Sequence, residues 1–351
     1  MSDKKKRVAV VPGDGIGVEV TREAVRVLRA LALPVETVEF DWGADRWLRD
    51  RTALPEGAIA DLRDHFDAIL FGAVGDPRVP SNVHARDILL ALRFQLDLYI
   101  NLRPVTLFEE WLCPIKGKTP RDVDLVILRE NTEGLYAGVG GNFKRDTPDE
   151  VAINEDLNTR KGVDRILRAG FELARARRKK LTMVDKANAL EFAHGLWRRA
   201  FAAMQKEFPD VACSVLFVDV CAMDLVRAPE KFDVIVTSNM FGDILTDLGA
   251  AIVGGLGVAA SGNIHPGRCS LFEPVHGSAP DIAGKGVANP LGSILSLALL
   301  LEHIGEKPAA ARVEAAVRRT VAQRKLTRDL GGELSTVACT DAVLHELGRA
   351  G

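Results

Sequence analysis

Two aspartates, Asp243 and Asp247, stand four residues apart in the segment "SNMFGDILTD" (238–247). If this segment is helical, the spacing places both carboxylates on one face, one turn apart. Adjacent carboxylates repel each other. Either they are solvated acids on a helix surface, or a divalent cation lies between them, and the segment alone leaves both readings open.

Charged residues also follow several apolar runs that have the length of strands. "DLVILRE" (124–130) ends in Arg129 and Glu130, "KLTMVDK" (180–186) ends in Lys186, and "SVLFVDV" (214–220) contains Asp219 near its end. Because the carboxyl ends of parallel strands line the ligand crevice of an α/β sheet, we expect these side chains to contribute to one polar site. Asp219 would add the third carboxylate to an oxygen ligand set typical of Mg²⁺ or Mn²⁺.

Arginines supply the opposite charge. The segment "ARDILLALRFQLDLYINLRPV" (85–105) places Arg86 and Arg93 seven residues apart, hence on one face of an expected helix, with Arg103 in the next element. Guanidinium groups bind carboxylates through paired hydrogen bonds. A cation together with several arginines, Arg129 included, indicates a small di- or tricarboxylate substrate.

The elements that must position these residues alternate along the chain. "RVAVVPGDG" (7–15), "DAILFGAVGD" (67–76) and "DVIVTSN" (233–239) are typical of buried strands, and residues 19–31 have helical apolar spacing. This alternation predicts an α/β fold with a largely parallel sheet. The glycines of "PGDGIGVEV" (12–20) follow a G-x-G-x-G pattern rather than G-x-G-x-x-G, which favours a ligand-proximal turn over a Rossmann dinucleotide motif.

Composition excludes several classes of protein. The 351 residues have a net charge of -2, so no global field favours nucleic acid or an anionic membrane surface. No apolar run is long enough to span a bilayer, and no secretory signal precedes the first strand. Five scattered cysteines without C-x-x-C spacing argue against a disulfide framework or zinc site and for a cytoplasmic location. We interpret "RARRKK" (175–180) as a solvated helix end.

Seven segments occur in an order that resembles a known family: "PGDGIGVEV", "NLRPV", "RENTEGLYAGVGG", "VDKANALE", "FGDILTDL", "GGLGVAASGNI" and "FEPVHGSAPDIAGKGVANP". Together they are similar to the β-decarboxylating dehydrogenases, which act on isocitrate, homoisocitrate, tartrate or 3-isopropylmalate. The resemblance covers essentially the whole chain. "DKAN" and "HGSAPDIAGKG" are most similar to the 3-isopropylmalate branch.

This resemblance implies a two-domain α/β fold of the isopropylmalate/isocitrate dehydrogenase type, distinct from the Rossmann fold. One domain, on the cofactor side, would combine residues 1–98 and 256–351. The other, residues 99–255, would provide the metal and substrate residues and form a homodimer. The polar segment at about 140–165 is either a surface hairpin or an arm that pairs with a second subunit. The resemblance further implies active sites shared between subunits.

The resemblance also implies residue roles. Asp243 and Asp247, with Asp219 from the partner chain, match the Mg²⁺/Mn²⁺ ligands, and a bound cation would offset their repulsion. Arg93, Arg103 and Arg129 match the residues that bind substrate carboxylates. Lys186, also donated by the partner chain, matches the group that takes the proton of the C2 hydroxyl. Tyr136 matches the acid that protonates the enol.

The cofactor assignment rests on the same resemblance. His276 and Asn289 match adenine contacts, Asp281 matches the residue that holds the ribose hydroxyls, and the neighbouring contacts fall on Gly277, Ser278, Ala279 and Ile282. A carboxylate at position 281 would repel a 2′-phosphate, so NAD is expected rather than NADP.

Some residues depart from the isopropylmalate pattern. Arg86 stands where those enzymes usually have glutamate, and it could bind an extra carboxylate, as in homoisocitrate, or remain an exposed helix charge. Leu89 and Leu90 match the isopropylmalate pattern and predict a partly apolar substrate pocket. We therefore expect NAD-dependent oxidative decarboxylation of 3-isopropylmalate in leucine biosynthesis. Homoisocitrate or another 3-substituted malate, such as isocitrate or tartrate, is the alternative substrate.

Two other classes of function would leave different marks on the sequence. A non-catalytic regulatory subunit should have lost a metal aspartate, the lysine or the tyrosine, all of which are present here. A Mg²⁺-dependent lyase would not need the adenosine-contacting residues, and lack of NAD affinity would favour it.

Overall fold

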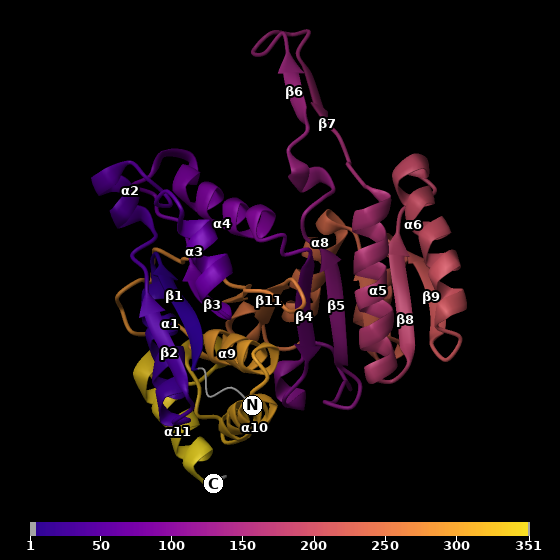
Figure 1. Cartoon of the computed structure of the whole chain (residues 1–351). Helices are drawn as coiled ribbons and strands as arrows, with labels where there is room; N and C mark the ends of the chain where they lie inside the picture. Colours follow the sequence, from indigo (N-terminus) through magenta and orange to yellow (C-terminus); the bar gives the residue numbers. More distant parts are fainter. Residues whose placement is uncertain (1–4, 350–351) are drawn as a thin grey trace. The chain divides into compact units, whose positions relative to one another are not determined.

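The computed structural model describes residues 5–349, which divide into two compact units. Unit 1 comprises the chain up to Leu98, Thr106–Pro120 and the chain from Ala250, and unit 2 comprises Tyr99–Val105 and Arg121–Gly249. The segment Thr106–Pro120, which the sequence analysis assigned to the central domain, thus belongs to unit 1. Each unit is an α/β layer structure, as the alternation of patterns predicted (Figure 1).

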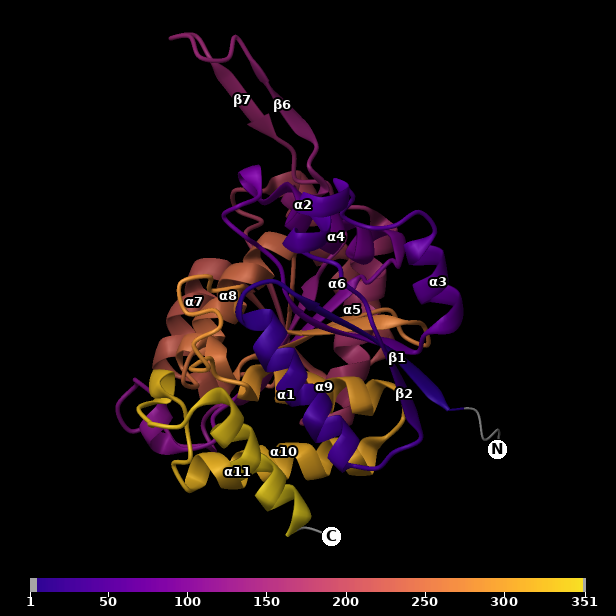
Figure 2. The same ribbon diagram turned by 90° about the vertical axis from the view of Figure 1, so that its left-hand side faces the viewer.

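Unit 1 contains a sheet with the strand order β2-β1-β3-β12-β11. Its strands are β1 (Lys6–Gly13), β2 (Val35–Glu39), β3 (Ala68–Ala73), β11 (Ala260–Ile264) and β12 (Ser270–Pro274). Its helices are α1 (Ile16–Ala30), α2 (Ala44–Asp50), α3 (Ala58–His65), α4 (Val83–Gln95), α9 (Leu291–His303), α10 (Lys307–Ala322) and α11 (Thr336–Gly348). Figure 2 shows α1, α9, α10 and α11 packed together in this unit.

Unit 2 contains strands in the order β4-β5-β10-β8-β9. These are β4 (Ile100–Thr106), β5 (Asp124–Glu130), β8 (Lys180–Asp185), β9 (Ala212–Phe217) and β10 (Val234–Thr237). The helices are α5 (Arg160–Ala176), α6 (Glu191–Met204), α7 (Val218–Arg227) and α8 (Asn239–Ala251). The pairs β5–β10, β10–β8 and β8–β9 are parallel, so the carboxyl ends of these strands lie at one edge.

Helix α5 shows why these segments fold onto the sheet. Its apolar residues recur every three to four positions, so one face of the helix is buried and packs against strands β5, β8 and β10 of the same unit. Phe171 lies on that face and stacks on Phe208 at a ring-centroid distance of 4.8 Å. In unit 1, a continuous apolar core is built around β1, β3 and α4 and includes Phe71, Ile88 and Leu92.

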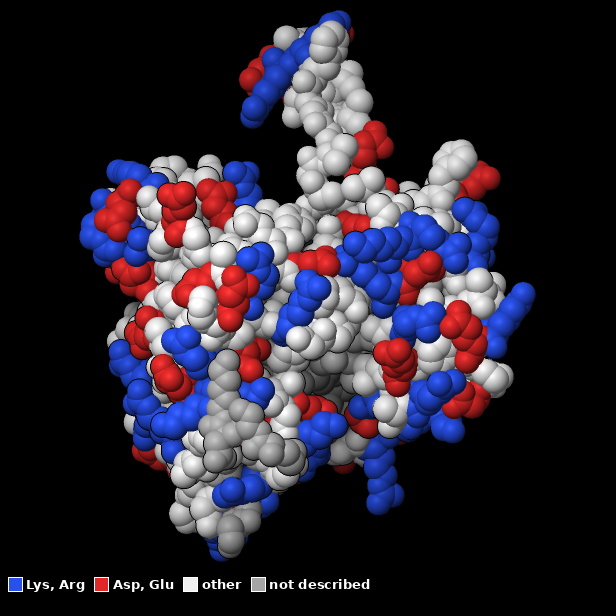
Figure 3. Space-filling view, viewed as in Figure 1, with Lys and Arg blue, Asp and Glu red and all other residues white. Residues whose placement is uncertain are grey.

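The segment at 140–165 forms an antiparallel hairpin of β6 (Gly140–Phe143) and β7 (Val151–Asn154), and the last part already belongs to α5. Its apolar side chains are exposed, with Phe143 at 66% and Ile153 at 52% of their full accessibility. Figure 3 shows charged side chains near its tip and mostly uncharged side chains along its stem. The hairpin is thus an exposed apolar arm of unit 2.

Two sequence-based interpretations were wrong in detail. The strand predicted up to residue 220 ends at Phe217, opposite Asp185 where its partner β8 also ends, so Asp219 lies in the first turn of α7. The basic segment 175–180 is not simply solvated. Arg177 and Arg178 bind Asp233, whose carboxylate is only 1% exposed.

In the part of the chain that the structure describes, no helix has both the length and the apolar character needed to cross a membrane.

Candidate active site

Arg129, the penultimate residue of β5, contacts helix α8. Its side chain is 2% exposed. Its Nε and Nη2 atoms donate to Oδ1 of Asn239 at 3.0 and 2.7 Å, and its Nη1 contacts Oδ1 of Asp243. A Cβ at Gly242 would lie 2.5 Å from Cβ of Arg129, so glycine is required for this approach. The sheet and the start of α8 therefore fix one guanidinium beside one carboxylate.

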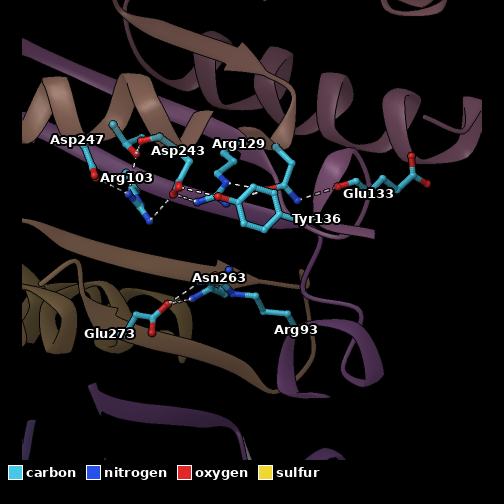
Figure 4. Close-up of polar contacts among 11 residues, drawn as sticks. Arg93, Arg103, Arg129, Glu133, Tyr136, Asp243, Asp247, Asn263 and Glu273 are labelled. Carbon is cyan, nitrogen blue, oxygen red and sulfur yellow. Dashed lines mark hydrogen bonds and ion pairs between the residues drawn. The ribbon is translucent and has the colours of Figure 1, made fainter. Parts of the chain in front are cut away.

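Asp243 is the point on which several groups of unit 2 converge (Figure 4). The Tyr136 hydroxyl donates to its Oδ2 at 2.8 Å, and Nη2 of Arg103 lies 3.7 Å from its Oδ1. The Arg129 guanidinium also lies 5.0 Å from the centroid of the Tyr136 ring. Asp243 and Tyr136 remain partly exposed, so a small polar ligand can reach them.

Asp247 lies one helical turn beyond Asp243, as the spacing predicted. Its carboxylate is 62% exposed, and Oδ1 is 3.4 Å from Nη1 of Arg103. That nitrogen also donates to the Thr246 hydroxyl at 2.6 Å. Within this chain the repulsion between the two aspartates is offset by Arg103 and Arg129. The exposed oxygens leave room for a further cation.

Lys186 and Asp219 form a separate pair, at the ends of the neighbouring strands β8 and β9. Nζ of Lys186 donates to Oδ1 of Asp219 at 2.5 Å. This ammonium holds the pKa of Asp219 below its usual value. Strand β10 lies between β8 and β5 in the sheet, which separates this pair from Arg129.

No group of three acidic, histidine or cysteine side chains close enough to hold a metal is found within residues 5–349. The donor chemistry of the expected ligands nevertheless suits Mg²⁺ or Mn²⁺, because hard cations prefer carboxylate oxygens and need positions open to water and substrate. Asp243 and Asp247 provide two partly exposed carboxylates on one face of α8. The third, Asp219, is held by Lys186 of the same chain.

In unit 1, helix α4 carries the remaining predicted substrate residues. Arg93 is buried and donates through Nη2 to Oε1 of Glu273 at 3.3 Å, and Asn263 donates to the same oxygen at 2.8 Å (Figure 4). Its Nε is buried without a hydrogen-bond partner among the described residues, so it could bind a substrate carboxylate. Arg86, in contrast, is 70% exposed and lies 3.7 Å from Asp87.

Leu89 and Leu90 of α4 have intermediate burial, and Leu89 packs on the core of unit 1. Leu90 is partly exposed beside it. Arg86 and Arg93 of this helix were predicted to share a face, but Arg86 is exposed and Arg93 is buried.

The predicted cofactor segment folds onto the start of α1. The Ile16 N–H donates to the Ser278 carbonyl at 2.8 Å, and a Cβ at Gly15 would lie 2.0 Å from that oxygen. Gly15 therefore allows the close approach of the two loops, and its expected place beside a ligand stays a prediction. Ala279 and Ile282 pack against Ile16, and Gly277 is exposed.

His276 and Asn289, the predicted adenine contacts, differ in their hydrogen bonding. Nε2 of His276 is buried and has no hydrogen-bond partner among the described residues. Asn289 is buried and donates to Asp329 at 2.9 Å, while its Oδ1 accepts from the Leu291 N–H at 3.0 Å. Asp281 is exposed, as a ribose-binding carboxylate would need to be.

Three further residues of this site were not predicted from the sequence. Asn239, Gly242 and Thr246 contact Arg129 or Arg103 and recur at helical spacing with Asp243. A helical projection of residues 239–247 would have placed them on one polar, small-residue face.

Three comparisons with known proteins agree. The family model described as "Isocitrate/isopropylmalate dehydrogenase" matches residues 7–344. Among similar proteins is a 3-isopropylmalate dehydrogenase of Thermobifida fusca, 47% identical, with 100% of both chains covered. Another from Mycobacterium tuberculosis is 49% identical, covering 94% of this chain and 99% of that protein.

Solved structures are also similar. Isocitrate dehydrogenase from Methylococcus capsulatus has a TM-score of 0.88 and 39% identity, covering 97% of this chain and 99% of its own. A β-decarboxylating dehydrogenase from Thermococcus kodakarensis has a TM-score of 0.82 and 38% identity, with 98% and 96% covered. These likenesses confirm the fold predicted from the motifs. The chain belongs to the isocitrate/isopropylmalate dehydrogenase family.

Proposed function

We propose that this protein catalyses the NAD-dependent oxidative decarboxylation of 3-isopropylmalate, with Mg²⁺ or Mn²⁺, to 2-oxo-4-methylpentanoate in leucine biosynthesis. The observation that supports it best is the convergence of Arg103, Arg129 and Tyr136 on Asp243. These groups can bind a carboxylate and deliver a proton at one place. The curated relatives described above are named 3-isopropylmalate dehydrogenase, and this supports 3-isopropylmalate as the substrate.

The arginines, Lys186 and Tyr136 have separate tasks in this reaction. Arg103 and Arg129 bind the substrate carboxylates, and Arg93 adds a buried donor. Lys186 takes the proton of the C2 hydroxyl as that carbon is oxidised. Tyr136 donates a proton to the enol carbon after the carboxylate has left, and its hydrogen bond to Asp243 orients the phenol.

Two bound groups would complete the site. Asp243 and Asp247, with Asp219 of a second subunit, would hold the metal, and the segment from His276 to Asn289 would hold NAD. When bound, NAD supplies the hydride acceptor, and the metal supplies Lewis-acid stabilisation of negative charge on the substrate oxygens.

The positions of the acids support a homodimer with shared sites. Asp219 and Lys186 are paired with each other and separated from Arg129 by strand β10. A site that includes all three aspartates therefore draws Asp219 and Lys186 from a second copy, with the exposed arm of residues 140–154 as the contact between copies. We propose a cytoplasmic location for this assembly.

The substrate assignment is tested by following NADH formation with Mg²⁺ on 3-isopropylmalate, homoisocitrate, isocitrate, tartrate and malate. We expect the highest kcat/KM for 3-isopropylmalate, since Leu89 and Leu90 are only partly buried while Arg86 is exposed. A preference for homoisocitrate that is lost in Arg86→Ala would contradict this and assign Arg86 to substrate binding.

The shared site is tested separately by complementation. Lys186→Ala and Arg129→Ala should each be inactive alone, but co-expressed copies should regain activity, because a mixed dimer contains one intact site. Lack of recovery, with mixed dimers shown to form, would contradict the sharing of sites between subunits.

A further inference from the structure

His194 is a buried histidine that the reaction outlined above does not use. It lies in the first turn of α6, its side chain is 1% exposed, and its ring meets that of Phe241 edge-on with centroids 5.2 Å apart. Desolvation by burial lowers the pKa of this imidazole, which keeps it neutral. A buried neutral imidazole has one donor and one acceptor nitrogen.

The acceptor nitrogen faces the backbone of Lys186. The Lys186 N–H donates to Nδ1 of His194 at 2.7 Å. This contact assigns the ring proton to Nε2, which has no hydrogen-bond partner within the described residues and lies 3.8 Å from Oδ2 of Asp156. The ring is therefore oriented by a short bond on one side and by a nearby carboxylate on the other.

Further hydrogen bonds hold the turn between β8 and α6, in which Lys186 lies. Asp185 accepts from the Ala187 N–H at 3.2 Å and is itself bound by Nε of Arg198 at 2.6 Å. The Lys186 carbonyl accepts from the N–H of Leu190 at 2.9 Å, and the N–H of His194 donates to the Leu190 carbonyl at the same distance. Of these contacts, the His194 ring provides the one that acts directly on the amide of Lys186.

We propose that His194 is a positioning residue for Lys186: by accepting the Lys186 N–H, it fixes the backbone from which the lysine side chain reaches the reacting hydroxyl. This proposal rests on the role of Lys186 given above. It predicts a loss in turnover rather than in substrate binding, because arginines on other elements bind the carboxylates. Misplacement of a catalytic group by about 1 Å can lower turnover by about 100-fold.

Two variants separate positioning from simple packing. His194→Leu keeps an apolar side chain of similar reach but removes the acceptor. His194→Asn retains a carbonyl oxygen close to the position of Nδ1, so it can accept the Lys186 N–H. His303→Leu is the control, because it removes a half-buried imidazole in unit 1 that contacts the Arg268 carbonyl.

Steady-state kinetics with 3-isopropylmalate should show kcat reduced about 10- to 100-fold in His194→Leu, with KM changed less than about threefold. His194→Asn should restore kcat to within about threefold of the unmodified protein. His303→Leu should leave both constants unchanged. Equal losses in the Leu and Asn variants, or full activity in His194→Leu, would overturn the proposal.

Hydrogen–deuterium exchange of the peptide that contains Lys186 gives a readout independent of activity. The amide should exchange slowly in the unmodified protein and in His194→Asn, and faster in His194→Leu. Unchanged exchange in His194→Leu would refute the contact even if the enzyme acts on another substrate. Failure of the unmodified protein to oxidise any 3-substituted malate would instead refute the proposed function.

Discussion

Asp243 and Asp247 allow the metal-binding role of a carboxylate to be separated from its structural role. The two residues have the same type, lie one turn apart on α8 and are both proposed ligands, yet their surroundings differ. Asp243 contacts the buried guanidinium of Arg129, whereas Asp247 is 62% exposed. The paired substitutions Asp243→Asn and Asp247→Asn remove one charge each at nearly constant shape.

The cost of Asp243→Asn follows from the burial of its partner. A hydrogen bond to a charged group contributes about 1.5–3 kcal/mol. Asp243 itself is 37% exposed, so water screens part of the interaction, and the asparagine oxygen can still accept. We therefore expect a loss of about 1–2 kcal/mol in the free energy of unfolding. For Asp247→Asn we expect a change within about 0.5 kcal/mol.

The assay is urea unfolding with a chelator present, so that metal binding contributes nothing to stability. Activity with added Mg²⁺ should fall in both variants by about 100-fold or more, because Lewis-acid stabilisation is worth several kcal/mol. Equal destabilisation of the two variants would refute the reasoning about Arg129. An unchanged Mg²⁺ dependence in Asp247→Asn would remove Asp247 from the ligand set.

Three further predictions concern other parts of the chain. Asp281→Lys should move the ratio of kcat/KM values from NAD towards NADP, and an unchanged ratio would contradict the ribose assignment. Asp233→Asn should lower the free energy of unfolding by about 1–3 kcal/mol, because Asp233 accepts from Nε of Arg177 and from the N–H of the next residue at 2.8 Å each. The control Asp210→Asn, at an exposed pair, should cause no measurable change in urea unfolding. The free energy of unfolding should also fall more steeply below pH 6.5 in the unmodified protein than in His194→Asn.

The sign of this pH effect follows from burial of His194. Its pKa in the folded state lies below the ordinary 6.5. As the pH falls below that value, the unfolded chain therefore binds more protons than the folded protein does. The stability that the neutral imidazole contributes is complete above pH 6.5 and is lost as the pH falls through the folded-state pKa. Parallel pH profiles for the two proteins would contradict the shift.

Local patterns of the sequence were sufficient for most of the elements. The apolar run at 124–130 became β5 with the same bounds, and the segment from Asn239 became a helix with its two aspartates one turn apart. Such features depend on neighbouring residues, since burial periodicity and helical spacing act over a few positions. The error at β9, in contrast, has a tertiary origin, because the strand ends where its partner β8 ends.

The pairings between distant residues could not be deduced in this way. Arg177 and Arg178 look like a solvated helix end until β10 brings the buried Asp233 against them. Lys186 and His194 are close in sequence, but only the turn between β8 and α6 aims Nδ1 at the Lys186 N–H.

The sequence by itself determined the order of elements, the chemical types available for the reaction and, through its motifs, the family. Only the tertiary structure decided which charges are neutralised by which partners: Arg129 by Asp243, Lys186 by Asp219, and Arg93 by Glu273. Residue type fixes what a side chain can bond to, whereas burial and distance are set by strand order and helix packing. Electrostatic and hydrogen-bond energies depend steeply on burial and distance.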